Sequence, residues 1–162
     1  EKLIIRRRKE DLCTSQTSTD DLINHVPDLI EEGHVLWTHV TSPFLNSHLY
    51  EQIIKAYQEG LKEGYDSLMT TTQLQTFIWN QSGPVNYDRS VEKWPRTQTL
   101  EPLYEVNSGA FLCHIDIYKQ LQDRIGDKPK LYTLNKLEGF DIDWPEDFLI
   151  AEYLLKQGFA KV

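Results

Sequence analysis

The sequence predicts a single α/β domain, because apolar runs of strand length alternate with segments of helical periodicity along most of its 162 residues. The clearest unit joins the apolar run 34–40 to the run 65–72 through a segment whose apolar residues recur at helical spacing. Strand, helix and strand in this order predict a parallel crossover connection. The composition agrees with this class, since 40% of the residues are hydrophobic and 26% are charged.

The remaining elements are predicted from the same patterns, taken in chain order. Leu3–Ile5 predicts a short first strand, and the hydroxyl-rich stretch 13–21 predicts a loop that caps a helix over 22–30. Asn46 or Ser47 is expected to begin the crossover helix. The later elements are expected to be a strand at 104–114, a helix at 116–125, a strand at 130–134 and a helix at 145–156.

Residues 77–103 interrupt this alternation. They combine turn-forming asparagine, glycine and proline with the aromatic residues Trp79, Tyr87 and Trp94. This mixture predicts a β-hairpin inserted into the α/β domain. If the aromatic side chains are exposed they indicate a contact surface, and if they pack together they form a small separate core.

Charge and hydropathy narrow the class of partner. The net charge of −8 argues against nucleic acid, because phosphate binding needs a basic face, and 6–9 is the one basic cluster. No apolar run has the length of a membrane span, and Cys13 and Cys113 form no disulfide framework. A cytoplasmic protein without a membrane partner is therefore expected. Because the chain begins without methionine, we expect it to be part of a longer one.

Two aspartates precede the last predicted helix, which Pro145 opens. Asp141 and Asp143 are two residues apart, so in an extended segment both carboxylates face the same side, as a Mg²⁺ site requires. An aspartate at this place is equally typical of a helix cap or turn, and the spacing leaves both readings open. In open α/β sheets ligands lie beyond the carboxyl ends of strands, so Thr41, Ser42 and the aspartates are expected on one rim.

Four segments in register resemble one known family. The sequence is similar to the sugar cytidylyltransferases related to acylneuraminate cytidylyltransferase (CMP-sialic acid synthetase). The family's motifs QPTSP, RTQ, ENGAIY and IDIDTPEDF are resembled by residues 39–44, 95–98, 105–111 and 140–148. The resemblance implies a nucleotidyltransferase fold: a Rossmann-like, GT-A-like sheet with helices on both faces and 77–103 as an inserted β-hairpin dimerisation segment.

The same resemblance implies a reaction. CMP would pass from CTP to the anomeric hydroxyl of an acidic sugar, an acylneuraminate or related nonulosonate, with release of pyrophosphate, and the enzyme would depend on Mg²⁺ and form a homodimer. The implied catalytic and metal-binding residues are Asp141 and Asp143. The implied nucleotide-binding residues are Thr19, His39 and Ser42, and the implied sugar-binding residues are Arg96, Gln98 and either Asn107 or Ser108.

The sequence departs from the family in two places. His39 stands where the family has glutamine, and nothing in residues 1–162 matches the family's glycine-rich loop for the triphosphate. We therefore expect residues 1–162 to be one cytidylyltransferase-like domain that is incomplete at its N-terminus. Two alternatives stay open: a non-catalytic module that binds a nucleotide or sugar nucleotide, and a general α/β interaction domain.

Overall fold

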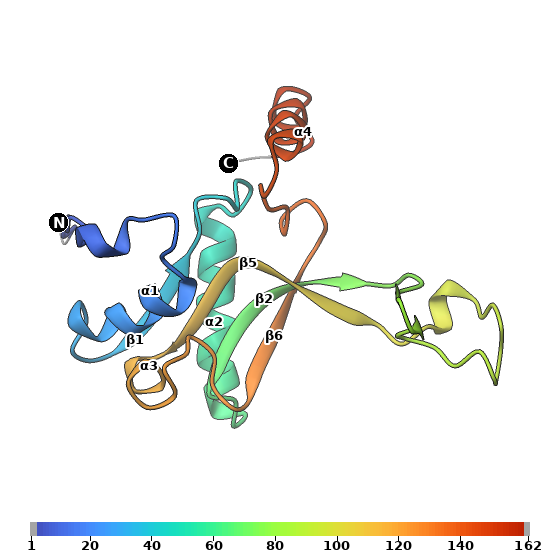
Figure 1. The fold of residues 1–162 in the computed structure, drawn as a ribbon, viewed down its shortest axis with the longest axis horizontal. Helices are drawn as coiled ribbons and strands as arrows, with labels where there is room; N and C mark the ends of the chain where they lie inside the picture. The colour runs from blue at the N-terminus through green and yellow to red at the C-terminus, as the bar shows by residue number, and fades with distance from the viewer. Residues whose placement is uncertain (1–2, 161–162) are drawn as a thin grey trace.

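A four-stranded mixed sheet forms the centre of the domain in the computed structural model, which describes residues 3–160 (Figure 1). The strand order is β1-β5-β2-β6, and β5 runs antiparallel to both of its neighbours, while β2 and β6 are parallel. Since β1 and β2 both oppose β5, they run in the same direction, which confirms the predicted crossover. The strands are β1 (His34–Thr38), β2 (Ser67–Leu74), β5 (Leu103–His114) and β6 (Pro129–Leu134).

The crossover helix α2 (Ser47–Lys62) covers one face of the sheet. It begins where expected, because the Asn46 side chain caps it by accepting a hydrogen bond from the Leu49 N–H at 3.1 Å. Its buried side packs on even-numbered sheet residues such as Leu68 and Leu112, which point to this face. The shared apolar core contains Leu45, Leu49, Ile53, Tyr57, Leu68, Ala110, Leu112 and Leu134.

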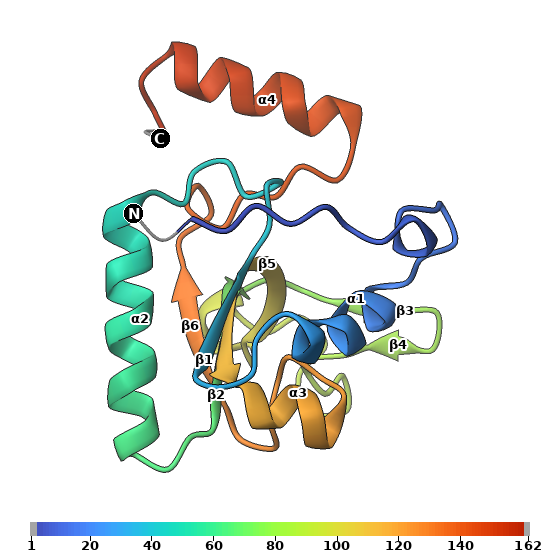
Figure 2. The ribbon, with the colours of Figure 1, turned by 90° about the vertical axis from the view of Figure 1, so that its left-hand side faces the viewer.

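Helices α1 (Thr19–His25) and α3 (Ile115–Leu121) cover the opposite face, so the sheet has helices on both sides (Figure 2). Their buried side chains meet odd-numbered sheet residues, including Val35 and Cys113. The structure is therefore an α/β fold, as predicted. The core on this face contains Ile23, Val26, Val35, Cys113, Ile115 and Tyr118.

Three predicted boundaries were wrong. Residues 3–5 are not a strand; Ile4 and Ile5 are 73% and 88% exposed and pair with no strand of the described chain. The helix predicted over 22–30 begins at Thr19, capped by Ser18, and gives way to the 3-10 turn η2 (Val26–Asp28), since Pro27 cannot donate a helical hydrogen bond.

The third boundary is the end of α3. The helix predicted over 116–125 stops at Leu121, because Gln122 adopts a left-handed conformation with φ of 54°. The chain then forms a loop over 123–128 before β6. This early end frees Arg124 from the helix and lets its side chain reach back across the sheet.

The insertion forms an arm that extends away from the sheet (Figure 1). It contains β3 (Trp79–Asn80), β4 (Gly83–Pro84) and the 3-10 turn η3 (Thr97–Thr99), which confirms the predicted hairpin. Buried Asn86 ties it together: its amide donates to the carbonyls of Thr76 and Glu101 and accepts from the N–H of Ile78.

The C-terminal helix α4 (Pro145–Lys156) has the predicted bounds and stands apart from the sheet (Figures 1 and 2). Only Ala151 of this helix is buried. Near the other end of the chain, the 3-10 turn η1 (Glu10–Leu12) precedes α1. Within residues 3–160, none of the helices combines the length and the apolar character that a membrane span needs.

Candidate functional site

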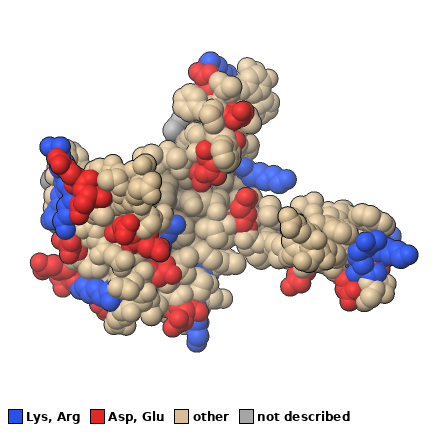
Figure 3. Space-filling view, viewed as in Figure 1, with Lys and Arg blue, Asp and Glu red and all other residues tan. Residues whose placement is uncertain are grey.

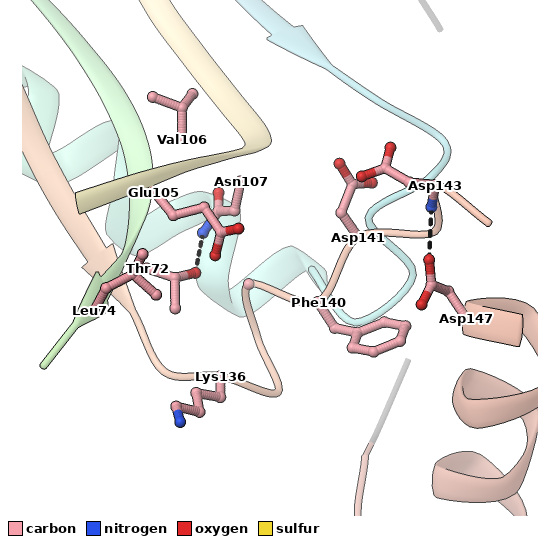
Figure 4. Close-up of a pocket in the computed structure, with 11 residues that line it drawn as sticks. Thr72, Leu74, Glu105, Val106, Asn107, Lys136, Phe140, Asp141, Asp143 and Asp147 are labelled. Carbon is pink, nitrogen blue, oxygen red and sulfur yellow. Dashed lines mark hydrogen bonds between the residues drawn. The ribbon is translucent and has the colours of Figure 1, made fainter. Parts of the chain in front are cut away.

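An open cleft of about 370 Å³ lies beyond the carboxyl ends of β2 and β6. One wall is formed by the end of β2 and the first half of β5, and the other by the loop that leads from β6 to α4 (Figure 4). This is the edge of the sheet at which the sequence predicted a ligand site. Its lining residues are Thr72, Leu74, Glu105, Val106, Asn107, Lys136, Gly139, Phe140, Asp141, Asp143 and Asp147.

The two predicted aspartates line this cleft, and their segment is fixed to the end of β1. The N–H of Ile142 donates to the carbonyl of Thr41 at 2.9 Å. This bond joins two segments a hundred residues apart in the chain and places them on one rim, as predicted. The Asp141 carboxylate also accepts a hydrogen bond from the Ile142 N–H, with Oδ1 at 3.0 Å.

The helix-capping role belongs to a third carboxylate, Asp147. Its Oδ2 accepts hydrogen bonds from the N–H groups of Asp143 at 3.1 Å and Trp144 at 2.9 Å, so it satisfies the N–H of the N-cap residue and of the residue before it. Figure 4 shows Asp147 on the helix side of the segment, with Asp141 and Asp143 on the other side. The side chains of Asp141 and Asp143 are therefore not needed as caps, and the sequence could not separate these roles.

A bulge in β5 shapes the opposite wall of the cleft. Met69 of β2 pairs with Phe111, whereas Thr71, two residues later, pairs with Val106. Four residues of β5 thus face one residue of β2, and Ser108 within the bulge has a left-handed φ of 57°. Bulges bend a strand and redirect its side chains, and they are common beside functional sites.

Asn107 is the residue that the bulge turns into the cleft. Its side chain is 5% exposed, donates through Nδ2 to Thr72 Oγ1 at 3.0 Å and accepts at Oδ1 from the Gly109 N–H at 3.3 Å. Of the two alternatives for this place, Asn107 lines the cleft and Ser108 does not. Because its amide already has two partners, Asn107 holds the wall of the cleft in shape.

Sequence reasoning did not identify Glu105 and Lys136 as site residues, although both line the cleft. Glu105 could have been found, because it is two residues before Asn107 on the same strand and so shares its face. Lys136 carries no sequence signal; it is the only cationic residue in the lining, and its side chain points away from the two aspartates (Figure 4).

His39 lies at the same rim, directly after β1, and contacts a cation that the sequence did not single out. Its Nε2 is 3.0 Å from Nη1 of Arg124. Burial, and then the positive charge of Arg124, lower the pKa of His39 below its ordinary value, while the negative charge of Asp141 acts in the opposite direction. The bond from the Ile142 N–H to the Thr41 carbonyl places the backbone after His39 beside the Asp141 segment.

The other predicted residues lie outside the cleft lining. Thr19 is the exposed first residue of α1, and Ser42 is buried in the turn after β1, where its hydroxyl has no hydrogen-bond partner among residues 3–160. Arg96 and Gln98 are exposed on the arm. The structure therefore brings together Asp141, Asp143 and Asn107, with His39 on the neighbouring turn. Arg96 and Gln98 lie on the arm, away from the cleft of the same chain.

The donor set at Asp141 and Asp143 suits a hard cation. Mg²⁺ prefers carboxylate oxygen and is usually held by one or two carboxylates, with waters or phosphates as its other ligands. Within the described part of the chain, no three acidic, histidine or cysteine side chains are arranged as a complete metal cage. Two carboxylates on one rim fit a metal that arrives with a phosphorylated ligand.

No protein-family model matches this sequence, and no curated protein is significantly similar to it.

Proposed function

We propose that this chain is the core of a cytidylyltransferase that transfers CMP from CTP to the anomeric hydroxyl of an acidic sugar and releases pyrophosphate. The observation that carries the proposal is the carboxylate pair Asp141 and Asp143. The pair lines the cleft beyond the carboxyl ends of β2 and β6, and Asn107 of β5 lies in the facing wall. Support also comes from the four motif segments in register with this family. The segments around His39 and Asp141 are joined by the bond from Ile142 to Thr41, and the segment around Asn107 forms the facing wall of the cleft.

In this reaction the sugar hydroxyl forms a bond to the α-phosphorus, the bond from that phosphorus to the pyrophosphate oxygen breaks, and the hydroxyl proton leaves to a base. Asp141 and Asp143 would hold Mg²⁺, which when bound neutralises charge on the triphosphate. The protein would then contribute to catalysis mainly by holding the reacting groups in position. The bond from Ile142 to Thr41 fixes the aspartates, and Asn107 fixes the facing wall. We also assign to Asp141 or Asp143 the role of orienting the sugar hydroxyl or accepting its proton.

The sugar-binding residues are assigned to the arm. Arg96 suits a sugar carboxylate because its guanidinium forms two parallel hydrogen bonds with one carboxylate group. Since Arg96 and Gln98 are exposed on the arm, we assign them to the cleft of a second copy, within a homodimer formed through 77–103. The outer end of the arm carries basic side chains next to acidic ones (Figure 3).

The exposed aromatic side chains of the arm support this contact. Trp94 and Trp79 are 65% and 46% exposed, and the guanidinium carbon of Arg89 lies 5.9 and 5.4 Å from their ring centroids. Phe77 packs edge-on against Tyr87 and Trp94, so the arm has a small aromatic core as well as an exposed surface. Aromatic and arginine side chains are enriched where proteins meet.

The test is pyrophosphate release from CTP and Mg²⁺ with a panel of 2-keto-acid sugars, alongside direct measurement of CTP and CMP binding. Release with one sugar, abolished in Asp141→Asn but retained in Glu146→Gln, which changes an exposed carboxylate outside the cleft lining, supports the proposal. Binding without release with every sugar supports instead the non-catalytic nucleotide-binding module. If the chain neither binds CTP or CMP nor releases pyrophosphate, both the cytidylyltransferase and the nucleotide-binding module are refuted.

A further inference from the structure

We propose that Arg124 locks His39 into one neutral tautomer, with the proton on Nδ1, and thereby makes His39 an obligate hydrogen-bond donor to the nucleotide at the rim of the cleft. Arg124 is then a positioning residue that acts through His39. The assignment of the ligand rests on the proposed function, whereas the tautomer lock does not.

The first step is the direction of the hydrogen bond between the two side chains. Nη1 of Arg124 lies 3.0 Å from Nε2 of His39. A guanidinium has five donors and no acceptor, so Nε2 must accept through its lone pair. The one proton of the neutral imidazole is then on Nδ1, which has no hydrogen-bond partner within residues 3–160.

The second step is that Arg124 cannot easily turn away. Its guanidinium carbon is 3.6 Å from the ring centroid of buried Phe111 and 5.4 Å from that of Trp37, so the cation is stacked on one aromatic ring and close to another. No carboxylate among residues 3–160 forms an ion pair with it. His39 is thus the hydrogen-bond partner of its side chain among these residues. Burial lowers the pKa of Arg124, while Tyr118 and Asp123 act in the opposite direction.

The third step is the place of the residue that carries the Nδ1–H. The His39 backbone is held at the end of β1, where its carbonyl accepts from the Ser42 N–H at 3.4 Å and closes the turn that contains Thr41. Thr41 in turn holds the segment of Asp141. A donor fixed at this rim selects a ligand with an acceptor there. A glutamine, as in the resembled family, offers both a donor and an acceptor, so the locked imidazole is the more restrictive group.

The first experiment reads the tautomer by long-range ¹H–¹⁵N NMR of the ¹⁵N-histidine-labelled chain at neutral pH, without ligand. We expect His39 to carry its proton on Nδ1 in the unsubstituted chain. The Arg124→Met variant should lose this preference because it has no donor, and the Arg124→Lys variant should keep it because lysine also only donates. His34, on the opposite face with Nδ1 2.8 Å from Tyr57 Oη, should be unchanged and reports that each variant is folded. A proton on Nε2 of His39 in the unsubstituted chain overturns the lock even if no variant folds.

The second experiment measures CMP binding by calorimetry in the same chain. Arg124→Met should weaken binding by on the order of fivefold, about the value of one hydrogen bond. In the His39→Leu background the same change should have no further effect, because Arg124 acts only through His39. A further loss in the double variant overturns the positioning role. If the unsubstituted chain does not bind CMP, the ligand assignment fails with the proposed function, and the NMR result decides the lock alone.

Discussion

Replacing Gly139 with alanine would place a methyl group against the two side chains that join β5 to β2 at the cleft. A Cβ built at this position lies 2.5 Å from Asn107 Nδ2 and 2.5 Å from Thr72 Oγ1, far inside van der Waals contact. Both partners are buried, at 5% and 7% exposure, and are hydrogen bonded to each other at 3.0 Å. The backbone of Gly139 does not have a positive φ, so the effect is steric and not conformational.

The expected loss is large for a single methyl group. Forcing a group into a packed site costs about 1–3 kcal/mol, and a buried amide left without its partner costs about 1–3 kcal/mol. We therefore expect Gly139→Ala to lower the free energy of unfolding by roughly 2–6 kcal/mol, a sizeable part of the about 5–15 kcal/mol that a domain has. Urea unfolding followed by tryptophan fluorescence measures this loss.

Gly60→Ala is the matched control. Gly60 is buried in α2, and the added Cβ would meet Cδ of the flexible Lys130 side chain at 2.8 Å, with the next atoms at 3.7 Å. Since alanine favours a helix interior by about 1 kcal/mol over glycine, this variant should be unchanged or slightly more stable. In an Asn107→Ala background the cost of Gly139→Ala should shrink. A Gly139→Ala variant as stable as the unsubstituted chain would refute the rigid junction described for this wall.

Three further predictions concern the helix, the thiols and the arm. Asn46→Ala should lower the free energy of unfolding by about 1 kcal/mol through loss of the α2 cap, while Asn46→Asp should largely retain it, as urea titration can show. A thiol reagent should label exposed Cys13 quickly and buried Cys113 only after unfolding. Burial raises the pKa of Cys113 from 9.0 to about 12. As the pH rises above 9 only the unfolded chain ionises this thiol, so the free energy of unfolding should fall. Mixing inactive Asp141→Asn with inactive Arg96→Ala should restore sugar-dependent pyrophosphate release if the arm serves the partner's cleft, and no recovery in mixed dimers would place Arg96 elsewhere.

Local signals in the sequence were sufficient for the regular elements. The crossover helix begins at Ser47 because Asn46 is a good cap, and α4 begins at Pro145 because proline fits the first turn. The same reasoning failed at 3–5, where three aliphatic residues have strand propensity but pair with no strand of the described chain. Propensity describes what a segment is able to form, and a strand also requires a neighbour.

The candidate site was predictable only in part. The rule for carboxyl ends of strands predicted that Thr41 and the segment of Asp141 and Asp143 lie on one rim, and the Ile142 bond to Thr41 confirms that these two segments are adjacent. Arg124 could not be found in this way. Its role depends on an early helix end and on a ring stacked beneath it, and both are contacts between distant segments.

The sequence by itself determined the α/β class, the crossover unit, the inserted hairpin and the edge of the sheet that carries the carboxylates. These depend on periodicity, caps and turns, which act between residues close in the chain. The tertiary structure decided which of Asn107 and Ser108 enters the cleft, and that Arg96 lies apart from the cleft of its own chain. These depend on the bulge in β5 and the reach of the arm, which arise only when segments far apart in the sequence pack together.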